Sequence, residues 1–175
     1  EKIDAIRDDM TKKKSEVYLM SSLNDIAWLF NIRGGDIAFT PVTYAYAMIT
    51  MNEAILYTHS EKIPDDVGKN LVEQSVTIKP YDSIFDDIYD ATENISVIYD
   101  PSKLNHALRS KIHESSDRVE KHELTMMMKA QMNETEIKNL KNCQIRDGVA
   151  LVKFLYWLEK AVHSEKLTEI TAADQ

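Results

Sequence analysis

The last third of the sequence contains one stretch of helical spacing that continues for about 30 residues. It opens at Asn133, an N-cap residue, and Glu136 follows three positions later, where its side chain can reach back to the N-cap amide. Gly148 is the one weak position inside it. The apolar residues that keep close to helical spacing are Ile137, Leu140, Ile145, Val149, Val152, Leu155, Leu158 and Val162. A helix of this length exceeds what a small α/β sheet needs, so residues 131–175 are predicted to begin a second domain.

The apolar face of this predicted helix is wide and needs a partner. The rest of the sequence offers little beyond residues 1–122 to cover it. We therefore expect the chain either to self-associate or to fold the helix back onto residues 1–122.

Short apolar runs alternate with amphipathic stretches over residues 1–122. The runs at residues 44–50 and 54–58 flank a tight polar turn and predict a β-hairpin. Strands are further expected at residues 17–20, 76–79 and 95–99, and helices at residues 2–13, 22–30, 81–90 and 104–113 and after Pro64. This order predicts an α/β fold with a mixed β-sheet flanked by helices, followed by the long helix. We place the domain boundary at residue 130, which gives an α/β domain at 1–130 and a truncated second domain at 131–175.

Composition excludes several classes of protein. The net charge of -8 argues against a nucleic-acid partner, which would need a basic surface. No apolar run approaches the roughly 20 residues of a membrane helix. The single Cys143 cannot form an internal disulfide, which favours a reducing compartment such as the cytoplasm, and it is predicted to be a small buried residue. The chain opens at Glu1 without Met and ends in a polar stretch, so we expect it to be a piece of a longer protein.

No catalytic set emerges from residue spacing. The histidines form no zinc motif, and His106 and His113, two turns apart on one predicted helix, are interpreted as surface residues. Adjacent acids occur at positions 8–9, 65–66 and 86–87, each within a predicted helix, where neighbours diverge and belong to a solvated face. The three methionines at 126–128 are interpreted as a packed connector between domains. We assign no catalytic residue and no metal ligand to this chain.

Residues 25–42, DIAWLFNIRGGDIAFTPV, place charges and glycines between two apolar runs. Two of the four glycines of the chain, Gly34 and Gly35, stand side by side here, and we expect them to supply backbone angles that a turn requires. Arg33 could act as a bidentate donor to a carboxylate. The alternative is a lock inside the loop, from Arg33 to Asp36 or to the backbone.

This stretch resembles the middle-domain signature of cytosolic-type aminopeptidase P (Xaa-Pro aminopeptidase), in the creatinase/prolidase superfamily. VTIKPYDSIFDDI and ISVIYDPSKLNHAL resemble later segments of the same domain. MMMKAQMNETEIKNLKNCQIRDGVALVKFLYWLE resembles the passage into the catalytic domain, and TEITAADQ the segment that follows. The resemblance covers essentially the whole chain, with the motifs in the family's order.

The resemblance implies a two-metal peptidase that removes an N-terminal residue preceding proline. In that family two related α/β domains precede a "pita-bread" catalytic domain, in which two Asp, one His and two Glu hold two divalent ions, typically manganese. These ligands lie beyond the position that matches Gln175, so no cofactor is expected in this chain. Residues 1–130 would be the middle domain, and residues 131–175 would begin the catalytic one.

The same resemblance implies the partners of the chain. They would be the remaining domains of the parent protein, peptides with proline at the second position, and a second copy in a homo-oligomer, with neither nucleic acid nor membrane. Arg33 and Asp36 would lie at the substrate rim or at an interface. The alternative function is that of a catalytically inactive family member, which acts as a binding or regulatory scaffold. The residues after Gln175 distinguish the two.

Overall fold

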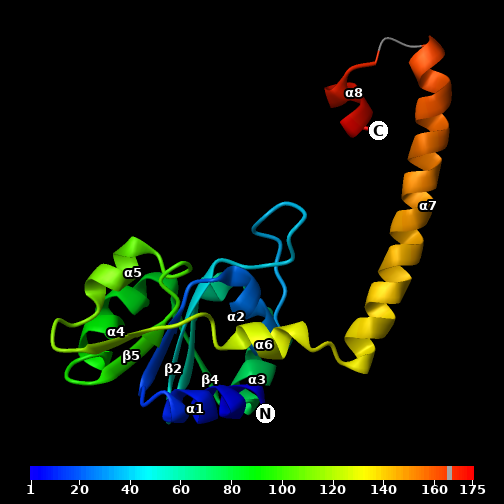
Figure 1. The fold of residues 1–175 in the computed structure, drawn as a ribbon. Helices are drawn as coiled ribbons and strands as arrows, with labels where there is room; N and C mark the ends of the chain where they lie inside the picture. Colours follow the sequence, from blue (N-terminus) through cyan, green and yellow to red (C-terminus); the bar gives the residue numbers. More distant parts are fainter. Residues whose placement is uncertain (165–166) are drawn as a thin grey trace. The chain divides into compact units, whose positions relative to one another are not determined.

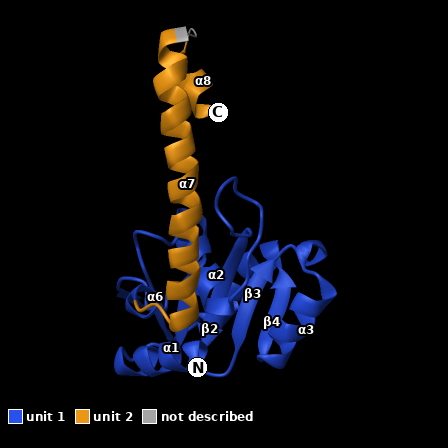
Figure 2. Ribbon diagram, turned by 90° about the vertical axis from the view of Figure 1, so that its right-hand side faces the viewer, with its two compact units in different colours: residues 1–130 blue, residues 131–175 orange. Residues whose placement is uncertain are grey.

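The computed structural model describes residues 1–164 and 167–175. It divides the chain into two compact units, Glu1–Ala130 and Gln131–Gln175 (Figure 2). Each unit is described by itself below.

Within residues 1–130, which the structure describes throughout, the strands form one six-stranded mixed sheet in the order β4-β3-β2-β1-β5-β6. The strands are β1 (Val17–Met20), β2 (Ala45–Thr50), β3 (Ala54–Thr58), β4 (Val76–Pro80), β5 (Ser96–Tyr99) and β6 (Asp117–Glu120). Strand β2 is antiparallel to β1 and β3, while β3–β4, β1–β5 and β5–β6 are parallel pairs. The other five strands therefore all end at the edge of the sheet where β2 begins. The predicted mixed sheet and hairpin are confirmed.

Helices cover both faces of this sheet (Figure 1). They are α1 (Lys2–Lys12), α2 (Leu23–Phe30), α3 (Asp65–Glu73), α4 (Ile84–Ala91), α5 (His106–Lys111) and α6 (Thr125–Ala130). Side chains from α1, α2 and α3 form one apolar core with the sheet, and Leu124 joins it just before α6. Side chains from α4 and α5 form a second core on the opposite face. Ile6 and Met10 lie on one face of α1 and are fully buried.

One strand and one α-helix of the first unit were not predicted. Strand β6 is a charged edge strand, in which Val119 is the apolar residue that packs against the core. Helix α6 occupies the methionine run that was interpreted as a connector, and Met126 and Met127 are exposed there while Met128 packs inward.

Helix α5 covers His106–Lys111 and is therefore shorter than the predicted helix at residues 104–113. His113 lies beyond that end, so it does not share a helix face with His106. Its ring instead contacts that of Tyr89, with ring centroids 4.4 Å apart.

The second unit consists of α7 (Glu134–Ser164) and the short α8 (Glu169–Ala173). The predicted capping box is present: Asn133 Oδ1 accepts from the Glu136 amide at 2.9 Å, and Glu136 Oε2 accepts from the Asn133 amide at 2.8 Å. Cys143 is half-buried rather than buried, because it lies on a single helix where its Sγ donates to Asp147 Oδ2 at 3.4 Å. Among the described residues, no helix is both long and apolar enough to cross a bilayer.

Candidate functional site

The loop that follows α2 is attached to the end of that helix by hydrogen bonds from Arg33. Helix α2 ends at Phe30, and the left-handed backbone of its C-cap residue Asn31 (φ 53°) turns the chain away. Arg33 Nη1 then donates to the carbonyl oxygens of Ala27 at 3.0 Å and Ile32 at 2.8 Å. Carbonyls at a helix C-terminus lack partners within the helix, and a cation satisfies them well. The guanidinium therefore fixes the loop to α2 through the backbone, and Arg33 is not paired with Asp36.

Asp36 organises the other end of this loop. Its carboxylate accepts from Thr43 Oγ1 at 3.0 Å, from the Tyr44 amide at 2.8 Å and from Lys62 Nζ at 2.8 Å. The hydrogen bond from Lys62 is the main reason why the pKa of Asp36 falls to about 2. Asp36 thus joins the loop to the start of β2 and to the segment after β3.

The glycines do not supply the backbone freedom that the sequence suggested. In the described residues no glycine has a positive φ. A Cβ on Gly34 would instead lie 2.8 Å from Thr43 Cβ and 2.9 Å from the Val42 carbonyl oxygen. Gly34 is therefore explained by the close approach of two chain segments, whereas a Cβ on Gly35 would meet open space.

The second apolar run of the stretch, residues 37–39, is exposed. Phe39 is fully exposed and Ile37 is also exposed. The Thr40 amide donates to the Ile37 carbonyl at 3.1 Å, which closes a tight turn on itself instead of extending the sheet. Phe39 has a left-handed backbone (φ 61°), which is rare for a bulky residue. The turn therefore presents an aromatic ring to solvent.

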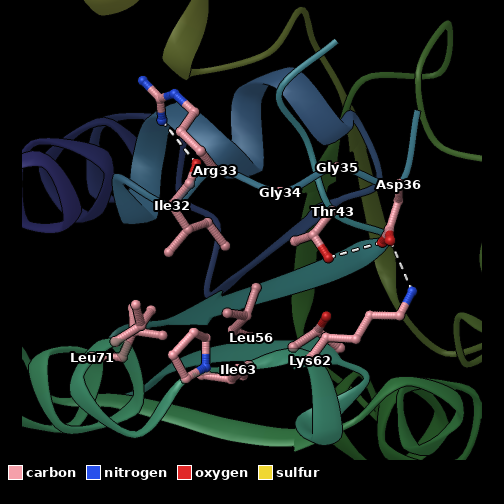
Figure 3. A pocket seen from close by; sticks show the side chains of 13 residues that line it. Ile32, Arg33, Gly34, Gly35, Asp36, Thr43, Leu56, Lys62, Ile63 and Leu71 are labelled. Atoms are coloured by element: carbon pink, nitrogen blue, oxygen red, sulfur yellow. Dashed lines mark hydrogen bonds and ion pairs between the residues drawn. The ribbon is translucent and has the colours of Figure 1, made fainter. Parts of the chain in front are cut away.

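Beneath this loop lies a cavity of about 230 Å³ (Figure 3). Ile32 faces it from the loop, and Leu56 and Leu71 face it from β3 and α3. The ion pair between Asp36 and Lys62 lies at one end of the cavity, while the Arg33 guanidinium points away from it (Figure 3). The cavity can hold a small apolar group beside a paired charge. Among the residues that the structure describes, no group of three or more His, Cys, Asp or Glu could hold a metal ion.

Sequence reasoning missed an aromatic row at the same edge of the sheet. The Tyr81 ring stacks between those of Tyr46 and His59, with centroid distances of 4.8 Å and 5.0 Å. Tyr81 follows β4, His59 follows β3, and Tyr46 lies in β2. The available signal was the position of each aromatic residue beside a strand end.

One acid of the pair at 86–87 also differs from its predicted role. Asp87 accepts from Tyr57 Oη at 2.9 Å and from Lys79 Nζ at 2.6 Å. Burial, and then the bond to Asp87, raise the pKa of Tyr57. Asp87 therefore ties α4 to the sheet, and only its neighbour Asp86 belongs to the solvated face.

The chain is similar to known proteins over its whole length. A family model described as the Creatinase/Prolidase N-terminal domain matches residues 1–136. A protein of Chaetomium globosum described as a probable Xaa-Pro aminopeptidase P is 37% identical over 185 residues, which cover 99% of this chain and 30% of that protein. Corresponding relatives of Sordaria macrospora and Neurospora crassa are 37% and 36% identical and are covered to 30% and 27% of their length.

Solved structures show the same fold. The crystal structure of an X-prolyl aminopeptidase from Caenorhabditis elegans, described as a cytosolic enzyme with a di-nuclear active site, superimposes with a TM-score of 0.87 at 31% identity. That match covers 99% of this chain and 29% of the other. An Xaa-Pro dipeptidase from Bacillus anthracis has a TM-score of 0.71 at 16% identity over 99% of this chain and 46% of its own, which supports the fold alone. The chain thus spans about 30% of the length of the curated relatives it matches.

Proposed function

Because the chain belongs to the creatinase/prolidase N-terminal domain family, we propose that it is the non-catalytic part of a two-metal Xaa-Pro aminopeptidase that removes an N-terminal residue preceding proline. The observation that carries the proposal is the 37% identity to a probable Xaa-Pro aminopeptidase P over 99% of this chain. The activity, two manganese ions and a cytoplasmic location belong to the proposed longer protein. The residues described here do not fit a dinuclear metal centre, so the chemistry is assigned to the rest of that protein.

We further propose that this part shapes the mouth of the active site. In sheets of this kind, ligands bind at the carboxyl ends of the strands, and five strands end at the edge where Asp36 and Lys62 meet. The same edge carries the exposed turn at Phe39. An exopeptidase must exclude chains that extend past the free N-terminus, and a turn held at its base by Asp36 can do so by shape.

The exposed apolar side chains of α7 support contacts with the remaining domains or with a second copy. Val152 and Ile145 are 66% and 67% exposed within the described part of the chain. Apolar surface of this kind marks an interface in proteins.

The first experiment measures activity and metal binding. The full-length protein, loaded with Mn²⁺, should cleave a peptide with proline at the second position, and residues 1–175 alone should not. Calorimetric titration of residues 1–175 with MnCl₂ should show no stoichiometric binding. Micromolar binding by residues 1–175 would contradict the assignment of the metal site to the rest of the protein. A folded full-length protein without cleavage activity would favour the regulatory scaffold instead.

The second experiment tests the active-site mouth. In the full-length enzyme, Phe39→Ala should lower kcat/KM for a tripeptide substrate by about tenfold. This corresponds to the loss of roughly 1.4 kcal/mol of transition-state stabilisation. Met51→Ala is the matched control, because Met51 is an exposed apolar residue in the turn at the opposite edge of the sheet. Equal kcat/KM values for the two variants would show that Phe39 is not part of the active-site mouth.

A further inference from the structure

A group of buried carboxylates lies beside the end of β1. Glu123, Asp100 and Asp25 are 6%, 4% and 7% exposed, and they come from segments far apart in the sequence. Tyr18 of β1 is fully buried among them. Buried carboxylates are rare unless they are paired, so each one needs an account of its partners.

Glu123 joins the end of the first unit to the sheet. The Tyr18 hydroxyl donates to Glu123 Oε2, and the Leu124 amide donates back to that hydroxyl at 3.2 Å. The Glu123 amide donates to Asp100 Oδ2 at 3.0 Å. Side chain and backbone together fasten residues 123–124 to β1 and to the loop after β5.

The two neighbouring carboxylates have further donors. Asp100 Oδ1 accepts from the Ser102 amide at 2.9 Å and from the Ser102 hydroxyl at 2.6 Å, and His122 Nδ1 lies 3.7 Å from Asp100 Oδ2. Burial alone would raise the pKa of Asp100, but the hydrogen bonds from Ser102 and from the Glu123 amide outweigh it and lower that pKa. Asp100 is therefore ionised at neutral pH.

Asp25 is held in the same way from α2 and α6. It accepts from Lys129 Nζ at 3.2 Å and from the Ser22 hydroxyl. Ser22 is the N-cap residue of α2, but its hydroxyl donates to Asp25 instead of accepting from a backbone amide. Lys129 thus fastens α6 to α2, and the two helices lie side by side in Figure 1.

Glu123 is the group in this arrangement that changes charge near neutrality. Burial is the main reason why the pKa of Glu123 rises to about 7, and the charges of Asp25 and Asp100 contribute to that rise. The hydrogen bond from Tyr18 and the charge of Lys103 act in the opposite direction.

We propose that Glu123 is a proton-operated latch for residues 123–130, which lead directly into the second unit. With the carboxyl group protonated, these residues stay docked on β1 and α2. When the proton leaves, a third negative charge forms between Asp25 and Asp100 without water around it, and the docked segment loosens. The latch is independent of the peptidase activity proposed above, since it requires no substrate and no metal.

The sign of the pH dependence follows from linkage. In the undocked segment Glu123 returns to its ordinary pKa of 4.5, whereas in the docked segment its pKa is about 7. Between these two values the docked state holds a proton that the open state has released, so docking weakens as the pH rises and levels off above 7. The opening constant should grow about tenfold per pH unit, on the order of 10²-fold over the whole range.

Hydrogen exchange followed by mass spectrometry tests this on residues 1–175. After correction for intrinsic exchange rates, protection of peptides covering residues 123–130 should fall with rising pH between 5 and 7, while peptides covering residues 54–58 keep theirs. Glu123→Gln should remove the slope, because the amide keeps an acceptor for Tyr18 and cannot ionise. Glu114→Gln, at an exposed glutamate, should keep it. A flat wild-type profile, or an unchanged slope in Glu123→Gln, would overturn the proposal.

A second measurement follows the titration in the wild-type protein. Carboxyl ¹³C NMR of the wild-type protein should show a glutamate titrating near pH 7. The loss of that signal in Glu123→Gln only assigns it. A Glu123 signal with its midpoint near 4.5 in the wild-type protein would contradict the latch.

Discussion

Gly34 and Thr43 lie so close that a Cβ on residue 34 would come within 2.8 Å of Thr43 Cβ. The contact forms where the loop after α2 passes the start of β2. Thr43 is also a hydrogen-bond donor to Asp36, so a shift of Thr43 would disturb the carboxylate that organises the loop.

Gly34→Ala should therefore destabilise the protein by about 1–3 kcal/mol, because neither Thr43 Cβ nor the Val42 carbonyl is the free end of a flexible side chain. Gly35→Ala is the matched control and should lie within about 0.5 kcal/mol of the wild type, since its Cβ meets open space. Urea unfolding of both variants measures the difference. Equal losses would show that the loop can rearrange around residue 34.

Arg33→Met should lower the free energy of unfolding by about 1 kcal/mol, because the carbonyl of Ala27 in α2 and that of Ile32 in the loop lose a charged donor. In the full-length enzyme KM should stay unchanged, since the guanidinium is directed at the backbone of its own segment. Thermal unfolding and steady-state kinetics together separate the two roles. A higher KM with unchanged stability would instead assign Arg33 to substrate binding.

Lys62→Met should raise the pKa of Asp36 from about 2 toward its ordinary 3.8, because the bond from Lys62 is the main cause of the low value. An acid with a depressed pKa in the folded state contributes stability above its unfolded pKa and loses it as the pH falls. Wild-type stability should therefore drop between pH 4 and 2, and less so in the variant. Carboxyl NMR gives the pKa directly, and Lys69→Met, at an exposed lysine of α3, serves as the control. If the titration midpoint of Asp36 is unchanged in Lys62→Met, Lys62 is not the cause of the low pKa of Asp36.

Residues 1–175 should self-associate, or fold α7 back, because its apolar side chains are exposed along the helix. Val152→Glu should weaken self-association, and Asn139→Glu, at an exposed polar position on the same helix, should not. Sedimentation velocity over a range of concentrations detects association. A monomer at every concentration, with rapid amide exchange along residues 134–163, would contradict both outcomes.

Periodicity predicted the elements that are defined by a buried side. Strands β1 to β5 are apolar runs bounded by polar residues or turns, and the start of α7 is marked in the sequence by its capping box. Strand β6 escaped prediction because it lies at the edge of the sheet, pairs with β5 alone among the described strands, and needs one apolar residue, Val119, to do so. The exposure of Phe39 could not be read from the sequence, because residue type records hydrophobicity, whereas the hydrogen bonds of the turn decide exposure.

The candidate site was accessible to sequence reasoning only in its local parts. The hydrogen bonds from Arg33 to neighbouring backbone carbonyls are one of the two alternatives that the sequence left open. The pairing of Asp36 with Lys62 depends on how two loops meet at the edge of the sheet. The spacing of residues in the sequence does not predict this meeting. Glu123 gave no signal at all, because its burial depends on Tyr18, 105 residues away.

The reversed direction of β2 has a practical consequence for studying this protein. In the turn at Met51–Glu53, the Asn52 and Glu53 amides donate hydrogen bonds to Thr50 Oγ1. This turn lies at the opposite end of the β2–β3 hairpin from Asp36. All three turn residues are exposed. A fluorophore or a short affinity tag attached at Asn52 would leave the cavity, the aromatic row and the Phe39 turn untouched, so binding and docking can be followed with one labelled protein.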